Sequence, residues 1–322
     1  MISVEKILKS AQKNSILVVG DVVLDSYDFC YTEQSRPSPE RPDKRVYTAH
    51  RIERMLGGAG NVAANLASLK VFTSLLSICG DDGNALEVRR LCDASGITHT
   101  LIEDASRPTT IKTRLYIDDH YLLRRDDELF HKISSEMSAD IRRQFENILD
   151  QVNAVILSDY NKGFFTQENA QAFIALCRER SIPVVVDLKP PNAAFFSGAT
   201  IVAPNLKEAR EIVKEFDPYQ KENSMRALDA ALSAESVVVT LGAEGMLVYD
   251  GKTATHVPGC SVDAVDPCGC GDTVRACLTI GLVCGLSLTK AAEFANRAAA
   301  LAVQKLGTST LSPQELLEGD CS

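Results

Sequence analysis

The stretch ILVVGDVVLD, residues 16–25, decides the fold expected for this chain. Its first half, Ile16 to Gly20, is a continuous apolar run that ends in glycine, which is typical of a strand buried in a parallel sheet. Further runs of this kind occur at 153–158, 183–187, 200–203 and 236–241. Segments with helical spacing separate or flank them, at 60–70, 85–95, 135–150, 167–180, 206–215 and 224–234. This alternation predicts a mainly parallel sheet covered by helices on both faces.

Two regions interrupt the alternation. Residues 22–55 contain polar segments with β propensity, and residues 109–126 alternate apolar and polar side chains around a turn at 118–120, which predicts a hairpin. We therefore expect a small β-sheet lid formed from about 22–55 and 109–126. No linker or repeat separates the remaining segments, so we expect one domain over residues 1–322.

The overall composition excludes several classes of protein. The 322 residues are 45% hydrophobic and 24% charged, which rules out a disordered chain, and the net charge of −9 argues against a nucleic-acid or membrane-surface partner. Residues 1–14 resemble a short amphipathic helix and not a secretory signal. The ten cysteines form no metal-binding CxxC pairs. We expect a cytoplasmic protein with reduced cysteines that pack in the core.

The segment VDPCGCGDTVRACL, residues 265–278, carries the clearest chemistry. Gly269, Cys270 and Gly271 precede an expected helix at 273–285, so their backbone amides and the helix dipole would favour an anion such as a phosphoryl group. Asp272 would repel that anion, but it suits a base that takes a proton from an attacking hydroxyl. The alternative is that Asp272 only caps the helix.

Other polar segments follow the expected strands. Asp21 and Asp25 follow the first strand, and SDYNKG (158–163), DLK (187–189) and PNLKE (204–208) follow later ones. Because the carboxyl ends of parallel strands meet at one edge, these groups are expected to gather at one site. The glycine-rich segment GGAGN (57–61) is neither a Walker loop nor a dinucleotide fingerprint.

Taken together, these segments resemble the ribokinase-like (pfkB type) carbohydrate kinases, and within them the heptose 7-phosphate kinases of the ADP-heptose pathway. The resemblance rests on GDVVLD, SRPSPERP, LGGAGNVAANLASL, SDYNKG, APNLKEA, GCGDT and KLGTSTLSP, in that order along nearly the whole chain. It implies a three-layer α/β/α sandwich with a β lid that commonly forms a homodimer, and a reaction that uses ATP and Mg²⁺.

The resemblance also implies roles for individual residues. Asp272 aligns with the catalytic base, and Gly269, Cys270 and Gly271 align with the anion hole. The positions implied to contact the sugar are Asp25, Gly57, Gly58 and Asn61. The positions implied to lie near the nucleotide are Asn205, Glu208, Thr240, Gly242 and Asn296, with Glu208 acting indirectly on Mg²⁺. Asp266 aligns with a monovalent-cation site, which adds K⁺ as a candidate cofactor.

Cations are needed for the phosphates of both substrates. Lys162 and Lys189 resemble phosphate neighbours in the family. For the far phosphate of a sugar phosphate we consider the lid cations, which are Arg36, Arg41, Lys44, Arg124 and Arg125. Cys268 and Cys270 depart from the small residues usual in this turn, and a thiol beside a helix N-terminus is expected to have a lowered pKa.

We therefore expect a kinase that phosphorylates the anomeric hydroxyl of a heptose 7-phosphate to give a heptose 1,7-bisphosphate. The first alternative is a kinase of the same fold that acts on another sugar or on a nucleoside. The second is a non-catalytic binding or redox-sensing protein, motivated by the cysteines around Asp272. Because the resemblance uses nearly all 322 residues, no fused nucleotidyltransferase is expected.

Overall fold

A nine-stranded sheet forms the centre of the computed structural model, which describes residues 3–319. Its order is β15-β14-β13-β12-β11-β10-β1-β6-β7, and the neighbours from β7 to β13 are parallel, whereas β14 and β15 are antiparallel additions at one edge. The strands are β1 (Ser15–Gly20), β6 (Phe72–Cys79), β7 (Thr98–Glu103), β10 (Ala154–Ser158), β11 (Val184–Asp187), β12 (Ile201–Val202), β13 (Ser236–Thr240), β14 (Gly245–Tyr249) and β15 (Ala254–Pro258). The predicted mainly parallel sheet is confirmed.

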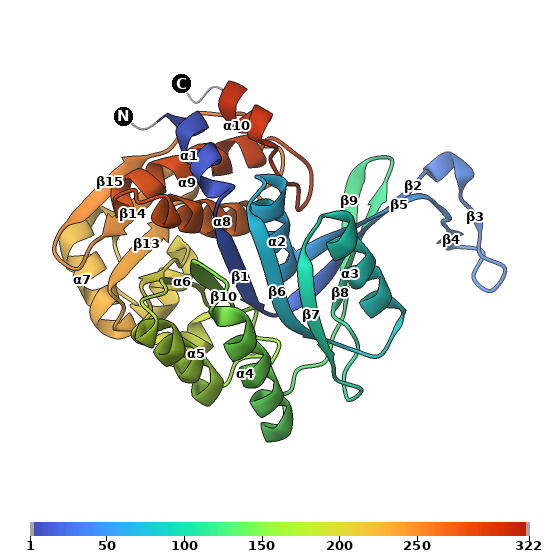
Figure 1. The fold of residues 1–322 in the computed structure, drawn as a ribbon. Helices are drawn as coiled ribbons and strands as arrows, with labels where there is room; N and C mark the ends of the chain where they lie inside the picture. Colours follow the sequence, from blue (N-terminus) through green and yellow to red (C-terminus); the bar gives the residue numbers. More distant parts are fainter. Residues whose placement is uncertain (1–2, 320–322) are drawn as a thin grey trace.

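Helices cover both faces of this sheet, as Figure 1 shows for α1, α8 and α9 on one side and α4 and α5 on the other. Successive side chains of β1 alternate between the two layers: Ile16 and Val18 belong to one apolar core, and Leu17 and Val19 belong to the other. The first core packs under α1 (Val4–Ala11), α2 (Ala59–Ser68), α3 (Gly83–Ala94), α8 (Cys270–Val283), α9 (Leu288–Ala302) and α10 (Pro313–Glu318). The second packs under α4 (Ser135–Leu149), α5 (Gln167–Glu179), α6 (Leu206–Ile212) and α7 (Lys221–Leu232).

A second, four-stranded sheet projects from the body. Its order is β5-β2-β8-β9, from β2 (Val22–Cys30), β5 (Ala49–Gly58), β8 (Ile111–Ile117) and β9 (His120–Asp127). The predicted hairpin is confirmed, because β8 and β9 are joined by Asp118 and Asp119, which both have the positive φ that a tight hairpin turn requires. The sequence regions expected to form the lid supply these strands.

A short arm extends beyond the second sheet. It pairs β3 (Arg36–Pro37) with β4 (Arg45–Val46), and Figure 1 shows it pointing away from the large sheet and from α8. Arg36 is exposed there. The structure therefore does not bring Arg36 close to Asp272 within one copy of the chain.

The helix that follows the glycine-rich turn begins earlier than expected. α8 starts at Cys270 and not at Thr273, and Gly269 is its N-cap with φ of +79°. Asp272 therefore lies inside the first turn, so its interpretation as a simple helix cap is wrong. Glycine is the residue that adopts such a left-handed conformation without strain.

The cysteines follow the expectation of core packing only in part, because Cys260, Cys268, Cys270 and Cys284 are half-buried. Each cysteine among residues 3–319 is free, and Cys30, Cys79, Cys92, Cys177 and Cys277 are buried. Cys321 lies outside the described residues. No helix in that described part of the chain is long and apolar enough to cross a membrane.

Candidate active site

A buried carboxylate lies at the start of α8. Asp272 is only 3% exposed, and both of its oxygens accept hydrogen bonds. Nδ2 of Asn61, from α2, donates to Oδ2 across 2.7 Å, and the hydroxyl of Tyr160, from the loop after β10, donates to Oδ1 across 2.7 Å. Burial raises the pKa of Asp272 above its ordinary value, although these two hydrogen bonds and the charge of Arg275 oppose the rise. The structure thus joins the expected base to Asn61, as well as to Tyr160, whose contact the sequence did not reveal.

Hydrogen bonds to the side chain of Asp21 fix the loop that carries Tyr160. Its carboxylate accepts hydrogen bonds from the backbone amides of Tyr160, Lys162 and Phe164, at 2.9, 3.1 and 3.3 Å. Asp21 is buried at the end of β1, and burial together with the charge of Asp159 raises its pKa to about 6. Asp21 therefore acts through the backbone of the SDYNKG segment, and its carboxylate orients the loop that holds Tyr160.

The turn before α8 is fixed at its start by Asp266. The carboxylate of Asp266 accepts hydrogen bonds from the amides of Cys268 and Gly307, both at 2.9 Å. The amide of Thr273 makes the first intrahelical bond, to the carbonyl of Gly269. The amides of Gly271 and Asp272 come before that bond, so they face the helix end without an intrahelical acceptor. This is the arrangement in which a helix binds an anion.

The side of Asp272 that faces the small sheet carries a second acidic group. Asp25, on β2, is 3% exposed and forms an ion pair with Arg114 of β8, with 2.5 Å between Oδ1 and Nη1. A Cβ atom at Gly57 would overlap Oδ2 of Asp25, so only glycine leaves this carboxylate in place. Arg114 was not predicted from the sequence, because its strand was recognised only as half of a hairpin.

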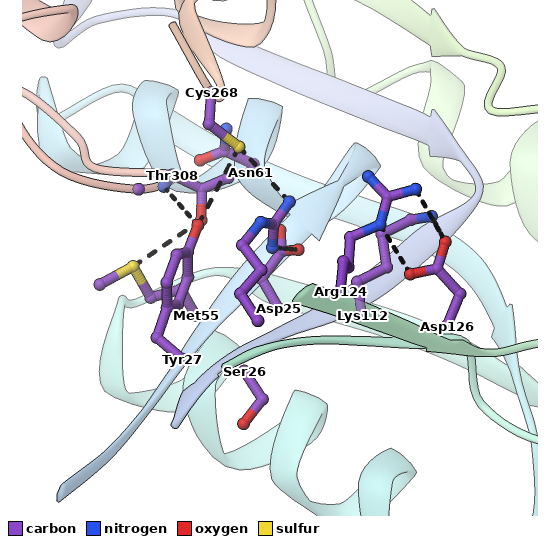
Figure 2. Close-up of polar contacts among 12 residues, drawn as sticks. Asp25, Ser26, Tyr27, Met55, Asn61, Lys112, Arg124, Asp126, Cys268 and Thr308 are labelled. Atoms are coloured by element: carbon purple, nitrogen blue, oxygen red, sulfur yellow. Dashed lines mark hydrogen bonds and ion pairs between the residues drawn. The ribbon is translucent and has the colours of Figure 1, made fainter. Parts of the chain in front are cut away.

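Figure 2 shows how the small sheet contacts the turn before α8. Nη2 of Arg114 lies 3.5 Å from Sγ of Cys268, and the hydroxyl of Tyr27 lies 4.0 Å from the same sulfur. The amide of Thr308 donates to that hydroxyl across 3.2 Å. Strands of the small sheet and the turn of the anion site are therefore in direct contact.

A cavity of about 430 Å³ opens beside these residues. Its lining includes Arg114, Arg124, Asp266 and Cys268, together with aromatic side chains of β8 and β9. Arg124 already forms an ion pair with Asp126, with 2.8 Å between Nε and Oδ1. Of the lid cations considered from the sequence, Arg124 is the one whose side chain lines this cavity.

Lys162 and Lys189 both have partners within the chain. Lys162 pairs with Glu128 across 2.6 Å and lies over the ring of Phe130, whereas Lys189 pairs with Glu208 across 2.6 Å. Burial lowers the pKa of Lys189, but the charges of Asp187 and Glu208 outweigh burial, so this pKa lies above its ordinary value.

The predicted nucleotide side is built around α6. Asn205 and Glu208 form a reciprocal capping box, in which each side chain accepts a hydrogen bond from the other residue's amide across 2.9 Å. The backbone of Asn205 also forms an isolated parallel β-bridge with that of Thr240 at the end of β13. Gly242 follows with φ of +64°. Asn296, on α9, donates instead to the carbonyl of Pro258 across 2.9 Å.

The expectation that the thiols of this turn have lowered pKa values is wrong. Burial raises the pKa of the Cys268 thiol, although Arg114 opposes the rise, and burial raises the pKa of Cys270 to about 11. The helix dipole was expected to lower both values, but loss of water around the sulfur has the larger effect. A redox role therefore loses the observation that motivated it.

The donor set fits ATP with Mg²⁺. Within residues 3–319 no cluster of three or more His, Cys, Asp or Glu side chains could hold a metal by itself. Mg²⁺ in phosphoryl-transfer sites is usually held by one or two carboxylates together with substrate phosphates, and the buried Glu208 beside Lys189 matches that pattern. The open amides of Gly271 and Asp272 are donors that could hold a phosphate.

Comparison with known proteins decides the family. The sequence profile described as pfkB family carbohydrate kinase matches residues 13–315. This chain belongs to the pfkB family of carbohydrate kinases. It is therefore a phosphotransferase with a sugar hydroxyl as acceptor, on a ribokinase-like fold.

Curated relatives of this pfkB chain carry the name Bifunctional protein HldE. The protein of Geotalea uraniireducens (strain Rf4) is 36% identical over 320 residues, which are 98% of this chain and 64% of the relative. That of Bradyrhizobium diazoefficiens is 39% identical over 316 residues, which are 94% of this chain and 62% of the relative. The chain thus spans less than two thirds of the length of these relatives.

Solved structures share the fold of this pfkB chain. Phosphofructokinase-2 from Escherichia coli, solved in complex with potassium, matches with a TM-score of 0.77 and 20% identity over 94% of this chain and 97% of its own. A putative sugar kinase from Clostridium perfringens matches with a TM-score of 0.72 and 18% identity over 94% of both chains.

Proposed function

We propose that this kinase transfers the γ-phosphoryl group of ATP to the anomeric hydroxyl of a heptose 7-phosphate, giving a heptose 1,7-bisphosphate. The observation that carries the reaction type is Asp272, a buried carboxylate held by Asn61 and Tyr160 next to the open amides of α8. The choice of acceptor is supported by the HldE relatives and by the motifs SRPSPERP and KLGTSTLSP.

The proposed chemistry has two parts, which are proton transfer to the carboxylate of Asp272 and stabilisation of phosphoryl charge by backbone amides of the turn. Asp272 accepts the proton of the attacking hydroxyl, and its raised pKa makes it a stronger base than an exposed aspartate. The turn Gly269, Cys270 and Gly271 is proposed to stabilise the charge that spreads over the transferring oxygens, and the amides open to do so are those of Gly271 and Asp272. Neither role requires a thiol, and the amide of Cys270 donates to the carbonyl of Pro267 across 3.3 Å, so Cys270 serves to shape the turn.

The acceptor is proposed to bind between the small sheet and α8. Asp25 would accept hydrogen bonds from sugar hydroxyls, with Asn61, Gly57 and Gly58 forming the floor of this site. The cavity of about 430 Å³ beside Arg114 supports a site for a bulky, phosphorylated sugar. The cations proposed for the far phosphate are Arg124 at that cavity and Lys162, together with Arg36, which would have to come from the projecting arm of a second copy.

ATP is proposed to bind on the α6 side. Its phosphates would meet Lys189, with Glu208 and Asn205 ordering Mg²⁺ and its waters. The nucleotide itself would lie along Thr240, Gly242 and Asn296. Asp266, which fixes the turn, is proposed to support a K⁺ ion, and the proposed reaction would take place in the cytoplasm, where ATP is available.

A homodimer through the small sheet is also proposed. Both outer strands of that sheet carry exposed apolar side chains, which are Ile52, Tyr121, Leu122 and Leu123. Exposed strand edges and apolar patches favour pairing with a second copy. Sedimentation of the purified protein would test this, and a monomer at micromolar concentration would argue against the dimer.

The acceptor is tested by a coupled assay of ADP release. Heptose 7-phosphate, the unphosphorylated heptose, common pentoses and hexoses, their phosphates and nucleosides are compared at equal concentration. We expect heptose 7-phosphate to have the highest kcat/KM and phosphorus NMR to reveal a new phosphate on the anomeric oxygen. Higher activity with another acceptor would replace heptose 7-phosphate while leaving the kinase assignment unchanged.

A further inference from the structure

An arginine is buried behind the anion-binding turn. Arg275, in the second turn of α8, is 5% exposed, and its Nη2 lies 2.7 Å from Oδ1 of Asp187 at the end of β11. Nη2 also donates to the carbonyl of Ala203 across 2.8 Å. The contact with Asp187 is an ion pair without the alignment of a directed hydrogen bond. A guanidinium is rarely buried unless its charge is paired, and Asp187 is the partner here.

Most of the N–H donors of this guanidinium have no hydrogen-bond acceptor within the described residues. Nε of Arg275 is buried without a hydrogen-bond partner, and no hydrogen bond from Nη1 occurs within residues 3–319. Arginine has five N–H donors, and buried donors are nearly always satisfied in native proteins. The contacts with Asp187 and Ala203 involve Nη2 alone, so they do not account for the rest of the group.

The position along the helix shows where the free donors point. Helical side chains lean toward the N-terminus, so a residue covers the one four positions before it, and here that residue is Gly271. A Cβ atom at Gly271 would overlap Nη1 of Arg275 and lie 3.3 Å from its Cζ. The guanidinium is therefore packed against the backbone of the turn whose amides are open, with Nη1 foremost.

The guanidinium of Arg275 is surrounded by carboxylates, whose negative charge it offsets. Asp187, Glu208 and Asp272 place three carboxylates around the turn, and all three raise the pKa of Arg275 by their charge. Lys189 is the other cation close to Asp187 and Glu208. Without Arg275, an incoming phosphate group would meet three carboxylates and one ammonium group.

We propose that Arg275 is a further phosphate-binding residue of this kinase, whose Nη1 donates a hydrogen bond to an oxygen of the phosphoryl group that ATP presents at the turn. The inference rests on the proposed use of ATP and assigns to one residue the recognition of its terminal phosphate. During transfer the phosphorus–oxygen bond to ADP breaks, the bond to the acceptor oxygen forms, and the acceptor proton goes to Asp272. Arg275 stays protonated throughout and offsets charge on the moving group.

The test compares two nucleotides that differ in the terminal phosphate. Titration calorimetry measures binding of Mg²⁺-ADP and of the Mg²⁺ complex of the β,γ-imido analogue of ATP to the wild type and to Arg275→Met. We expect binding of the triphosphate analogue to weaken by roughly tenfold or more, the usual effect of losing a charged hydrogen bond, while ADP affinity changes less than about twofold.

Two further variants separate this role from a structural one. Arg275→Met leaves Asp187 buried without a cation, so the double variant Arg275→Met/Asp187→Asn removes both charges and is expected to fold with the same selective loss. Asp187→Asn alone retains the guanidinium and is expected to retain the preference for the triphosphate. Thermal unfolding of all three confirms that folded protein is compared.

Each outcome has a distinct meaning. Equal losses for both nucleotides, or no loss for either, in the folded double variant would overturn the role of Arg275. Failure of the wild type to bind either nucleotide would instead overturn the proposed use of ATP, and the role of Arg275 with it. Selective loss in Asp187→Asn to the same extent would assign the effect to the ion pair and not to the free donor.

Discussion

The hydroxyl of Tyr160 donates a hydrogen bond to Oδ1 of Asp272 across 2.7 Å, although 112 residues separate the two in the sequence. The partner oxygen, Oδ2, accepts from Asn61, so the carboxylate is held from two elements at once. In the proposed reaction, an acceptor hydroxyl would approach a base that is already oriented. Such fixed geometry favours proton transfer because no reorganisation is needed during the reaction.

Replacing the proposed base is the most direct test of the site. Asp272→Asn keeps the size of the side chain but removes the negative charge that accepts a proton. We expect kcat to fall by about 10²- to 10⁴-fold, the usual contribution of a general base, with thermal unfolding little changed. Steady-state kinetics measure the change, and Asp263→Asn, an exposed position of the same loop, is the matched control. Turnover close to that of the wild type would exclude Asp272 as the base.

Removing the tyrosine hydroxyl tests how the base is held. Tyr160→Phe deletes a hydrogen bond that stabilises the carboxylate, so the pKa of Asp272 rises further above its ordinary value. Because the base is active only when ionised, the acid limb of the kcat/KM profile is expected to move to higher pH. The lost bond is also expected to cost about 1–2 kcal/mol of stability.

The matched control for that variant is Tyr219→Phe, because the Tyr219 side chain is 81% exposed. This control should leave the acid limb where it is in the wild type. An acid limb of Tyr160→Phe that moves to lower pH, or that stays in place while kcat falls, would contradict the stabilising role of this hydrogen bond.

The sequence predicted the groups near the site better than their contacts. Asp272 was identified because a glycine-rich turn before a helix has a local signature, whereas Asn61 was identified through the family resemblance of the segment around it. Arg275 and Arg114 were missed, because periodicity marks their positions as helix and strand and says nothing of which distant group each side chain meets. Their partners Asp187 and Asp25 lie 88 and 89 residues away. Likewise, the start of α8 at Cys270 depends on the left-handed Gly269, which sequence patterns place only to within a few residues.

The thiols of the turn are expected to react slowly. The thiolate is the reactive form, and the pKa of Cys270 at about 11 leaves a thiolate fraction of only about 10⁻⁴ at pH 7. Iodoacetamide labelling followed by peptide mass spectrometry should show little modification of Cys268 and Cys270 at pH 7, with rates that increase as the pH is raised toward 10. Cys277, fully buried in α8, is the protected reference. Rapid labelling of Cys268 or Cys270 at pH 7 would revive the redox interpretation.

The contact between Gly271 and Arg275 makes a prediction about stability that is independent of nucleotide. In Gly271→Ala the new methyl group overlaps Nη1 of a guanidinium that Asp187 and Ala203 hold in place, so the protein is expected to lose about 1–3 kcal/mol of stability, as overpacked interiors do. Chemical unfolding measures the loss. Gly83→Ala, at a helical glycine with open space around it, is the control and is expected to be close to neutral or stabilising.

Adding Arg275→Met to Gly271→Ala distinguishes packing from phosphate binding. The flexible methionine can move away from the new methyl group, so the double variant is expected to lose less stability than the sum of the two single variants. Its affinity for the triphosphate analogue should nevertheless remain as low as in Arg275→Met, because the donor is still missing. Recovery of that affinity together with stability would mean that the arginine acts on the phosphate only by shaping the turn. Strict additivity of the two stability losses would mean that the methyl group and the guanidinium do not compete for the same space.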